Sequence, residues 1–395
     1  LRSGSALSRV SGSGAVLGSN AKSSSGSEKK AREARHKRFS LRKDVQRSVV
    51  RAGIKEGLKY PRNFHRVGHC GHTPISDLVH VKKSSKTGKH YYGGLATCGS
   101  VWACPVCAAR IQEVRRVELA EGMASAYKLG LQPVMVTLTF PHTRKQSLEE
   151  LLSAQARALY LLRSGDRATK FKVATGFKGL IRSLEVTHSQ KSGWHPHVHE
   201  LWFVSADVDA SYIRGLVLPM WRSSCKSAGL LEAGGAGFDD HAVDVKGWCS
   251  TSDYLAKQDS TDHWGVDREM AKGVTKKGKK SGRHPFHLAE LAADGCRQSE
   301  ALFLEYVKAF HGKSQLYWGR GLRELLGVSV SSDEDAAKGE DKPDKLIKIL
   351  DREEWKLIVA HDAESRILDL FETRGVDGVM RWMTAPEIPP GMTVQ

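Results

Sequence analysis

No stretch of this sequence is long and apolar enough to cross a membrane. We find no run of about 18 apolar residues and no apolar core of a secretion signal. Acidic residues are scarce beside basic ones, 44 against 61, which gives a formal charge of +17 over 395 residues. A membrane surface would attract this charge too, but without a span we favour a cytoplasmic protein that binds nucleic acid. Because residue 1 is Leu rather than Met, the sequence leaves open whether residues precede it.

Cysteine is also sparse, and the number of cysteines is odd, which disfavours a disulfide framework. Four of the seven lie within residues 70–107, and this clustering points to a metal site in a cytosolic protein. Cys104 and Cys107 form a CxxC pair, and no βαβ unit follows that would make it a redox motif. We therefore predict a structural zinc site with four thiolate ligands, with His72 as the alternative fourth ligand. The ligands would be Cys70, Cys98, Cys104 and Cys107. The isolated cysteines are expected to be buried thiols, namely Cys225, Cys249 and Cys296.

Internal repeats are absent, and the length suggests two or three folded units. Residues 1–28 are rich in Ser and Gly and are expected to be disordered. The basic run at 29–51 can be a solvated helix face or an arm that contacts phosphates, and charge alone does not decide between them. A second basic, Gly-containing stretch follows at 270–284.

Three histidines occupy alternate positions in "GWHPHVHELWF" at 193–203. Residues 179–204 are typical of two strands around a polar turn, so these side chains should point to one face. If the hairpin is symmetric about Lys191, Glu185 lies opposite His197, and two imidazoles (His197 and His199) and one carboxylate can meet one metal. A shift of one residue would place Glu185 on the wrong face, and a lone His-x-His is more often an ordinary polar strand.

A tyrosine and a lysine lie three residues apart in "STSDYLAKQ", at Tyr254 and Lys257, and hence on one face of an expected helix. Tyrosine is a competent nucleophile, but taken alone this pair is better explained as a packed aromatic residue and a solvated lysine. Tyr306 is a competing nucleophile, although its apolar helix makes it resemble a core residue. Thr137 and Thr139 share one face of the strand at 133–140, which we expect to lie beside the histidines.

Three short motifs in this order resemble those of the HUH nucleases: "VMVTLTF" (134–140), "HPHVHEL" (195–201) and "DYLAKQ" (253–258). The order is similar to that of rolling-circle plasmid replication proteins of the single-tyrosine Rep_1 type. The resemblance covers about residues 65–328, including the cysteine block, "GRHPF" (282–286) and the segment 304–327. No second Tyr lies one helical turn from Tyr254, so paired-tyrosine initiators and transposases are less similar.

The resemblance implies an α+β fold, with a central antiparallel sheet of the HUH type, flanking helices and a helix that places Tyr254 across the site. It implies a nuclease that nicks one strand at the plasmid origin through a 5′-phosphotyrosine, leaves a 3′-OH primer and later rejoins the strand. The catalytic residues would be Tyr254 and Lys257. His197, His199 and Glu185 would hold Mg²⁺ or Mn²⁺, and the sequence does not choose between the two. Some relatives carry a Glu one turn before the Tyr for termination; here Ser250 occupies that position.

Two other functions remain open: an HUH-type transposase, and a zinc-containing DNA-binding regulator that is not an enzyme. The expected partners are origin DNA, single-stranded at the nick, and host helicase, polymerase and single-strand-binding protein; no membrane is expected, and a homodimer is left open. We predict five parts. These are a disordered basic N-terminal arm (1–47), a cysteine-rich zinc-binding segment (48–110), a nicking and strand-transfer domain (111–330), an acidic linker (331–345) and a helical tail (346–395).

Overall fold

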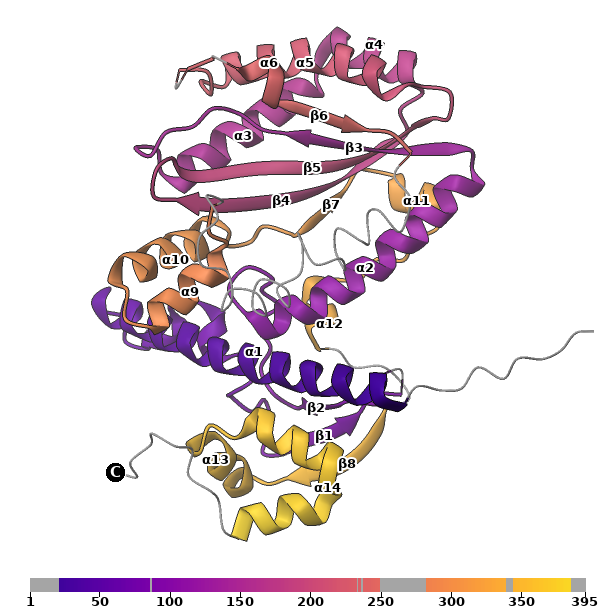
Figure 1. The fold of residues 1–395 in the computed structure, drawn as a ribbon. Helices are drawn as coiled ribbons and strands as arrows, with labels where there is room; N and C mark the ends of the chain where they lie inside the picture. The colour runs from indigo at the N-terminus through magenta and orange to yellow at the C-terminus, as the bar shows by residue number, and fades with distance from the viewer. Residues whose placement is uncertain are drawn as a thin grey trace, which may run out of the picture.

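The computed structural model shows an α+β protein built on two antiparallel sheets, which confirms the predicted fold class (Figure 1). It describes residues 21–85, 87–232, 234–235, 237–248, 282–338 and 344–384, with side chains from residue 28 onward. None of the helices in these ranges is long and apolar enough to cross a membrane.

The larger sheet has five strands in the order β6-β3-β5-β4-β7, and every neighbouring pair is antiparallel. β4 and β5 form a long hairpin. Gly193 has a φ of +77° at the end of the turn, where a Cβ atom would come within 2.8 Å of the Arg144 backbone. The strands are β3 (Leu131–Leu138), β4 (Gly179–Ser189), β5 (Gly193–Ser205), β6 (Val243–Lys246) and β7 (Leu316–Trp318).

Helices lie over both faces of this sheet. One face lies under α3 (Leu148–Leu162), α4 (Gly165–Thr175), α5 (Ala210–Ser227) and α6 (Phe238–His241), at the top of Figure 1. Ser147 and Glu150 form a capping box at the start of α3, as the Ser-x-x-Glu spacing predicts. On the opposite face α2 (Pro105–Lys128) packs against half of the sheet through a separate apolar cluster that includes Leu119 and Met123.

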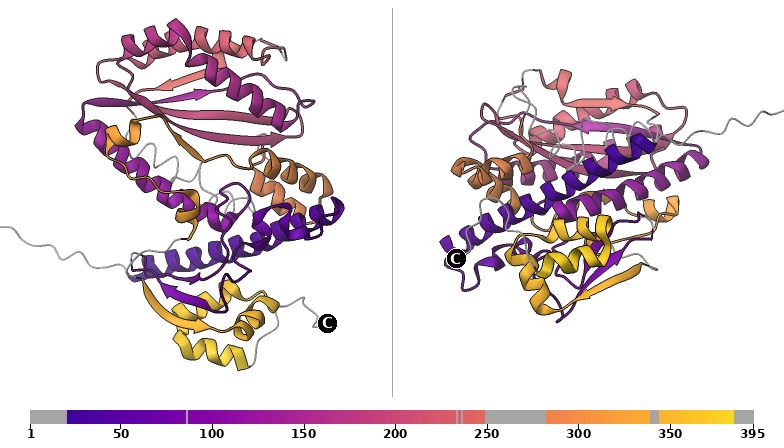
Figure 2. Two further views of the ribbon diagram at one scale, coloured as in Figure 1. Left: turned by 180° about the vertical axis from the view of Figure 1, so that it is seen from behind. Right: turned by 60° about the horizontal axis from the view of Figure 1, so that its bottom comes forward.

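The smaller sheet joins segments from the two ends of the chain. Its order is β2-β1-β8, so β8 (Lys345–Leu350) pairs with β1 (Val79–Lys83), which also pairs with β2 (His90–Gly93). α13 (Arg352–Ala360) and α14 (Glu364–Thr384) follow β8 and pack beside this sheet (Figure 2). The predicted helical tail (346–395) is therefore wrong for residues 346–350, which form a strand because a distant partner strand is available.

The basic run at 29–51 belongs to a packed helix, which corrects the predicted disordered arm (1–47) for its residues 29–47. α1 (Ala21–Lys55) places Leu41, Val45 and Val49 at helical spacing, and all three are buried. In Figure 1 the helix lies between α2 and the smaller sheet. The prediction of an arm rested on the basic residues of this run and not on the spacing of its apolar residues. Residues 1–20 lie outside the described residues.

The remaining described elements connect the two sheets. The predicted acidic linker also contains structure, because α12 (Asp333–Lys338) packs on α2 with Ala336 and Ala337 buried. The five-part division itself stays a prediction. The other elements are η1 (Pro61–Phe64), η2 (Arg66–His69), α9 (Pro285–Ala293), α10 (Arg297–Ala309) and α11 (Leu322–Leu326).

A buried carboxylate on α14 joins the two ends of the chain. Glu364 is 1% exposed and is paired with Arg42 and Lys43 of α1. Arg35, about two turns earlier on α1, is paired with Asp369 and Glu372. Much of the positive charge of α1 is therefore neutralised inside the protein.

Replacing Glu364 with Ala should lower the free energy of unfolding by about 3–5 kcal/mol, because it leaves the buried Arg42 guanidinium unpaired. Denaturant unfolding of the two proteins measures this. Glu353→Ala is the matched control, since Glu353 is 78% exposed and paired with Lys356 on α13; it should leave the unfolding curve nearly unchanged. Equal stability of wild type and Glu364→Ala would contradict the role given to this contact.

Candidate metal centre

Glu185, His197 and His199 converge on one point of the larger sheet. Glu185 of β4 pairs with His197 of β5, so the predicted register is confirmed. The Glu185 Oε2 atom lies 3.1 Å from His197 Nε2 and 3.2 Å from His199 Nε2. The three side chains are half-buried and come from two hydrogen-bonded strands.

The neighbouring strand β3 orients one of these imidazoles. Thr137 pairs with His199, and its hydroxyl lies 3.0 Å from His199 Nδ1, so Nε2 is turned toward Glu185. Such a contact to the far ring nitrogen is how metal-binding histidines are commonly oriented. Thr139 does not take part, since its hydroxyl donates to the carbonyl of His241.

The electrostatics of the trio favour a cation between its members. Burial alone would raise the pKa of Glu185, but the hydrogen bonds and charges of His197 and His199 hold it well below its ordinary value. Burial alone would lower the pKa of His197, yet the Glu185 carboxylate raises it. Glu185 thus stays ionised, and its negative charge favours a proton on His197. A divalent cation bound between them would take the place of that proton.

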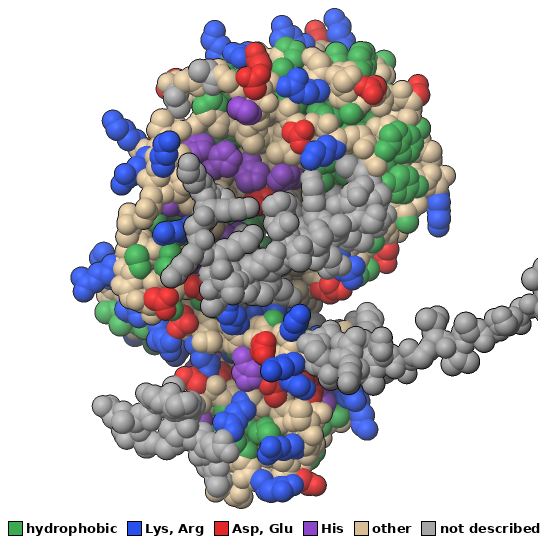
Figure 3. All heavy atoms as spheres, viewed as in Figure 1, with side chains coloured by type: hydrophobic (Ala, Val, Ile, Leu, Met, Phe, Trp, Pro, Cys, Tyr) green, Lys and Arg blue, Asp and Glu red, His purple; other side chains and the backbone are tan. Residues whose placement is uncertain are grey.

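The donor set fits a small divalent cation. One ligand atom from each residue lies within 4.8 Å of the others, so all three can contact one ion. Two imidazole nitrogens and one carboxylate oxygen suit metals such as Mn²⁺ and leave coordination positions open. Figure 3 shows histidine side chains gathered in one patch on the surface of the molecule that faces the viewer.

The third histidine of the strand has a different partner. His195 shares the face of His197, but its Nδ1 lies 2.6 Å from Nε2 of His142, whose Nδ1 donates to the carbonyl of Ser192. Burial and the nearby imidazoles of His197 and His142 lower the pKa of His195 to about 4. The sequence reading missed His142; its place two residues after the Thr-Leu-Thr-Phe strand was the available signal.

The structure does not describe the predicted nucleophile. Tyr254, Lys257 and Ser250 lie outside the described residues, together with Cys249 and most of the basic stretch at 270–284. The competing candidate Tyr306 is 2% exposed and its ring lies 4.8 Å from that of Phe310. Tyr306 is therefore a core residue, as expected, and its burial raises the pKa of its hydroxyl well above the ordinary value.

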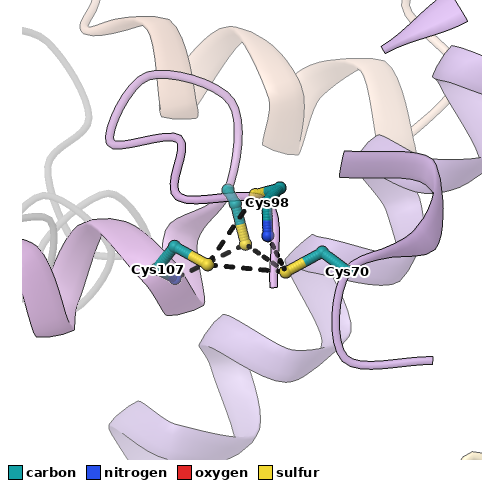
Figure 4. Close-up of side chains that lie close together, drawn as sticks. Cys70, Cys98 and Cys107 are labelled. Carbon is teal, nitrogen blue, oxygen red and sulfur yellow. Dashed lines mark hydrogen bonds between the residues drawn. The ribbon is translucent and has the colours of Figure 1, made fainter. Parts of the chain in front are cut away.

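The four clustered cysteines meet in the interior, at the start of α2 (Figure 4). Cys104 caps α2, Cys107 lies in its first turn, Cys70 follows η2, and Cys98 lies in the loop between β2 and α2. The Sγ atoms of Cys70 and Cys107 are 3.4 Å apart. The Cys70–Cys104 and Cys98–Cys107 separations are both 3.7 Å.

These separations fit a metal site and not a disulfide. A bonded pair of sulfurs would be about 2 Å apart, whereas tetrahedral zinc with bonds of about 2.3 Å places its sulfurs roughly 3.8 Å apart. Backbone N–H groups of Cys98 and Cys107 each approach a sulfur at 3.4 Å, which favours thiolates. The group can therefore hold a metal such as zinc. His72 is not part of the cluster.

The two other described cysteines differ from each other. Cys225 is buried, as predicted, and burial raises the pKa of its thiol well above the ordinary value. Cys296 is exposed, which corrects the prediction of a buried thiol, because it lies immediately before the first turn of α10.

Comparisons with known proteins point to one family. A family model described as "Replication protein" (Rep_1) matches residues 95–354. "Protein rep" of Streptomyces lividans is 27% identical over 353 residues, covering 72% of this chain and 76% of the relative. "Neomycin resistance protein" of Streptomyces cyanogenus is 29% identical over 135 residues, covering 28% of this chain and 31% of that protein. No solved structure matches.

We expect purified, reduced protein to contain about one zinc ion per chain by elemental analysis. Cys107→Ser should remove the metal and destabilise the protein, because ligand loss removes binding energy that also stabilises the fold. Cys225→Ser is the matched control, since it replaces a buried thiol outside the cluster and should keep the zinc. Zinc-free wild type, or a Cys107→Ser variant with full zinc content, would refute the assignment.

Proposed function

Because the chain belongs to the Rep_1 family of replication proteins, and is on that ground a plasmid replication initiator that binds origin DNA, we propose that it nicks one DNA strand. The nick would leave a 3′-OH primer for rolling-circle synthesis, and the enzyme would later rejoin the strand. The observation that carries this proposal is the convergence of Glu185, His197 and His199 on one point.

In this proposal the trio holds Mg²⁺ or Mn²⁺ beside the scissile phosphate. A bound divalent cation would neutralise the charge on the non-bridging oxygens of the phosphate. The protein's part is to fix the two imidazoles and the carboxylate on strands inside the sheet, where their positions vary little. Thr137 would keep Nε2 of His199 directed at the ion.

Tyr254 would supply the nucleophile. Its hydroxyl loses a proton, and its oxygen attacks phosphorus and forms the 5′-phosphotyrosine bond. The bond from phosphorus to the 3′-oxygen breaks, and that oxygen takes up a proton to become the primer 3′-OH. The phosphodiester linkage is conserved, so the reverse attack can rejoin the strand. Lys257 would favour the phenolate or contact the phosphate through its positive charge.

The four cysteines would bind one structural zinc. All four cysteines are buried and lie far in the sequence from Glu185. A zinc ion that only stabilises the fold needs no open coordination position. The metal would hold the end of η2, the loop between β2 and α2 and the start of α2 together, so its role would be to support the fold.

Tyr254→Phe should abolish the covalent complex with a single-stranded origin oligonucleotide while leaving DNA binding intact, because only the hydroxyl is removed. A gel that retains protein-linked labelled DNA under denaturing conditions measures the complex. Tyr306→Phe should form it normally, as its hydroxyl is buried in the core. A complex that forms with Tyr254→Phe but not with Tyr306→Phe would refute the assignment.

His197→Ala and His199→Ala should each weaken Mn²⁺ binding by at least about tenfold and prevent cleavage, because each removes one of three ligands. Calorimetric titration with Mn²⁺ gives the affinity independently of activity. His80→Ala, a strand histidine of the other sheet, is the control and should behave as wild type. Cleavage at an undiminished rate in EDTA would exclude the metal role.

A further inference from the structure

A basic groove separates α1 from the β1–β2 hairpin, far along the chain from the metal centre. Its volume is about 380 Å³, and its cations come from both walls: Arg32 and Arg38 from α1, Lys83 and Lys89 from the hairpin. The groove belongs to the smaller sheet, on the side of α1 away from the five-stranded sheet (Figures 1 and 2).

The positive charge of this groove is cancelled only in part, because Arg35 is the one lining cation that is paired with Asp369 and Glu372 among the ion pairs of the described residues. Arg35, Arg42 and Lys43 are each paired with carboxylates of the C-terminal segment. Arg32, Lys83 and Lys89, in contrast, form no ion pair with any residue of the described ranges. Two carboxylates, Glu28 and Glu372, line the groove against five Lys and Arg side chains.

One of those carboxylates fixes the walls of the groove. Oε1 of Glu372 accepts a hydrogen bond from Arg35 of α1 at 2.7 Å and another from the backbone N–H of His90 in β2 at 3.1 Å. The His90 ring in turn stacks on Phe371 of α14, with centroids 6.0 Å apart. Glu372 therefore links α1 to the hairpin. Arg32, Lys83 and Lys89 project from elements whose relative positions are already fixed before a ligand binds.

The lining indicates what kind of polyanion would fit. No Phe, Tyr or Trp lines the groove among the residues that the structure describes, so unpaired bases would find no stacking surface there. Lys83 and Lys89 are exposed, and Thr87 and Gly88 between them are small, so a large ligand can approach. Cations on both walls of an open groove suit the sugar–phosphate backbone of a duplex, which is bound through charge and without base contacts.

We propose that this groove binds the phosphate backbone of duplex DNA flanking the nick. The choice of DNA over another polyanion rests on the proposed replication function. The metal centre would act on the single strand while the groove holds adjoining duplex. Neither task shares a residue with the other.

The test compares two triple variants that remove the same amount of charge. The groove variant is Arg32→Gln, Lys83→Gln and Lys89→Gln. The control is Lys170→Gln, Lys172→Gln and Lys226→Gln, three exposed lysines on α4 and α5. Affinity for a fluorescent duplex of random sequence is measured at several salt concentrations, since phosphate contacts do not depend on sequence. Zinc content and circular dichroism report on folding.

The groove variant should bind the duplex more weakly and show a shallower dependence of log affinity on log salt. The slope should fall by about 0.9 for each phosphate that is no longer neutralised, and by about 2.7 for three. The control should match wild type. Equal slopes of log affinity against log salt in the groove variant and the control would overturn the proposal. An acidic protein would then be the better candidate ligand for the groove. The double variant Lys83→Gln, Lys89→Gln changes only the hairpin and should show about two thirds of the effect.

The same proteins separate this inference from the proposed function. The groove variant should still form the covalent complex with a short single-stranded oligonucleotide at saturating concentration. If wild type forms no complex, the nicking proposal fails, yet the salt slopes still decide whether the groove binds duplex. If the groove variant alone fails to form the complex, the groove serves the nicking site, and the separate duplex role is overturned.

Discussion

Four cysteine side chains that meet within 4.8 Å in the interior impose the strictest constraint on this fold. Four thiolates can share so small a volume only when a cation neutralises them. Three elements depend on that point. Cys104 caps α2, and Cys70 ends η2. Gln46 of α1 donates to the carbonyls of Val67 and Cys70, both at 2.9 Å. α2 then runs 24 residues from the cluster to β3, the strand that carries Thr137.

The parts of the site that could be predicted are those governed by local geometry. Side chains alternate along a strand, and a tight hairpin pairs residues equidistant from its turn, so Glu185 opposite His197 follows from counting. The CxxC spacing and the clustering of four cysteines within residues 70–107 likewise predict a metal cluster. His142 was missed because its contact with His195 joins a loop to a strand 53 residues away.

The parts of the fold that could not be predicted depend on partners distant in the chain. The sequence predicted a disordered basic arm where α1 lies, but Arg35 and Lys43 pair with carboxylates more than 300 residues later. β8 was read as helix because a short apolar run fits either structure, and only its pairing with β1 decides. In both cases tertiary contacts, which leave no local pattern, override propensity.

One face of the five-stranded sheet is apolar where it packs on α2 and polar where the candidate metal ligands lie. The change from apolar to polar side chains occurs within single strands. On β5, Leu201 is buried against α2, while His199, two residues earlier on that face, points to Glu185. On β3, Met135 and Thr137 make the same change. The apolar half of this face packs on α2 and thereby fixes the strands. The polar half lies on the same strands, so its side chains are held in place although they have no apolar core of their own. Since alternation has a period of two, a shift of the β5 register by one residue would turn the ligands and their anchor to the wrong face together.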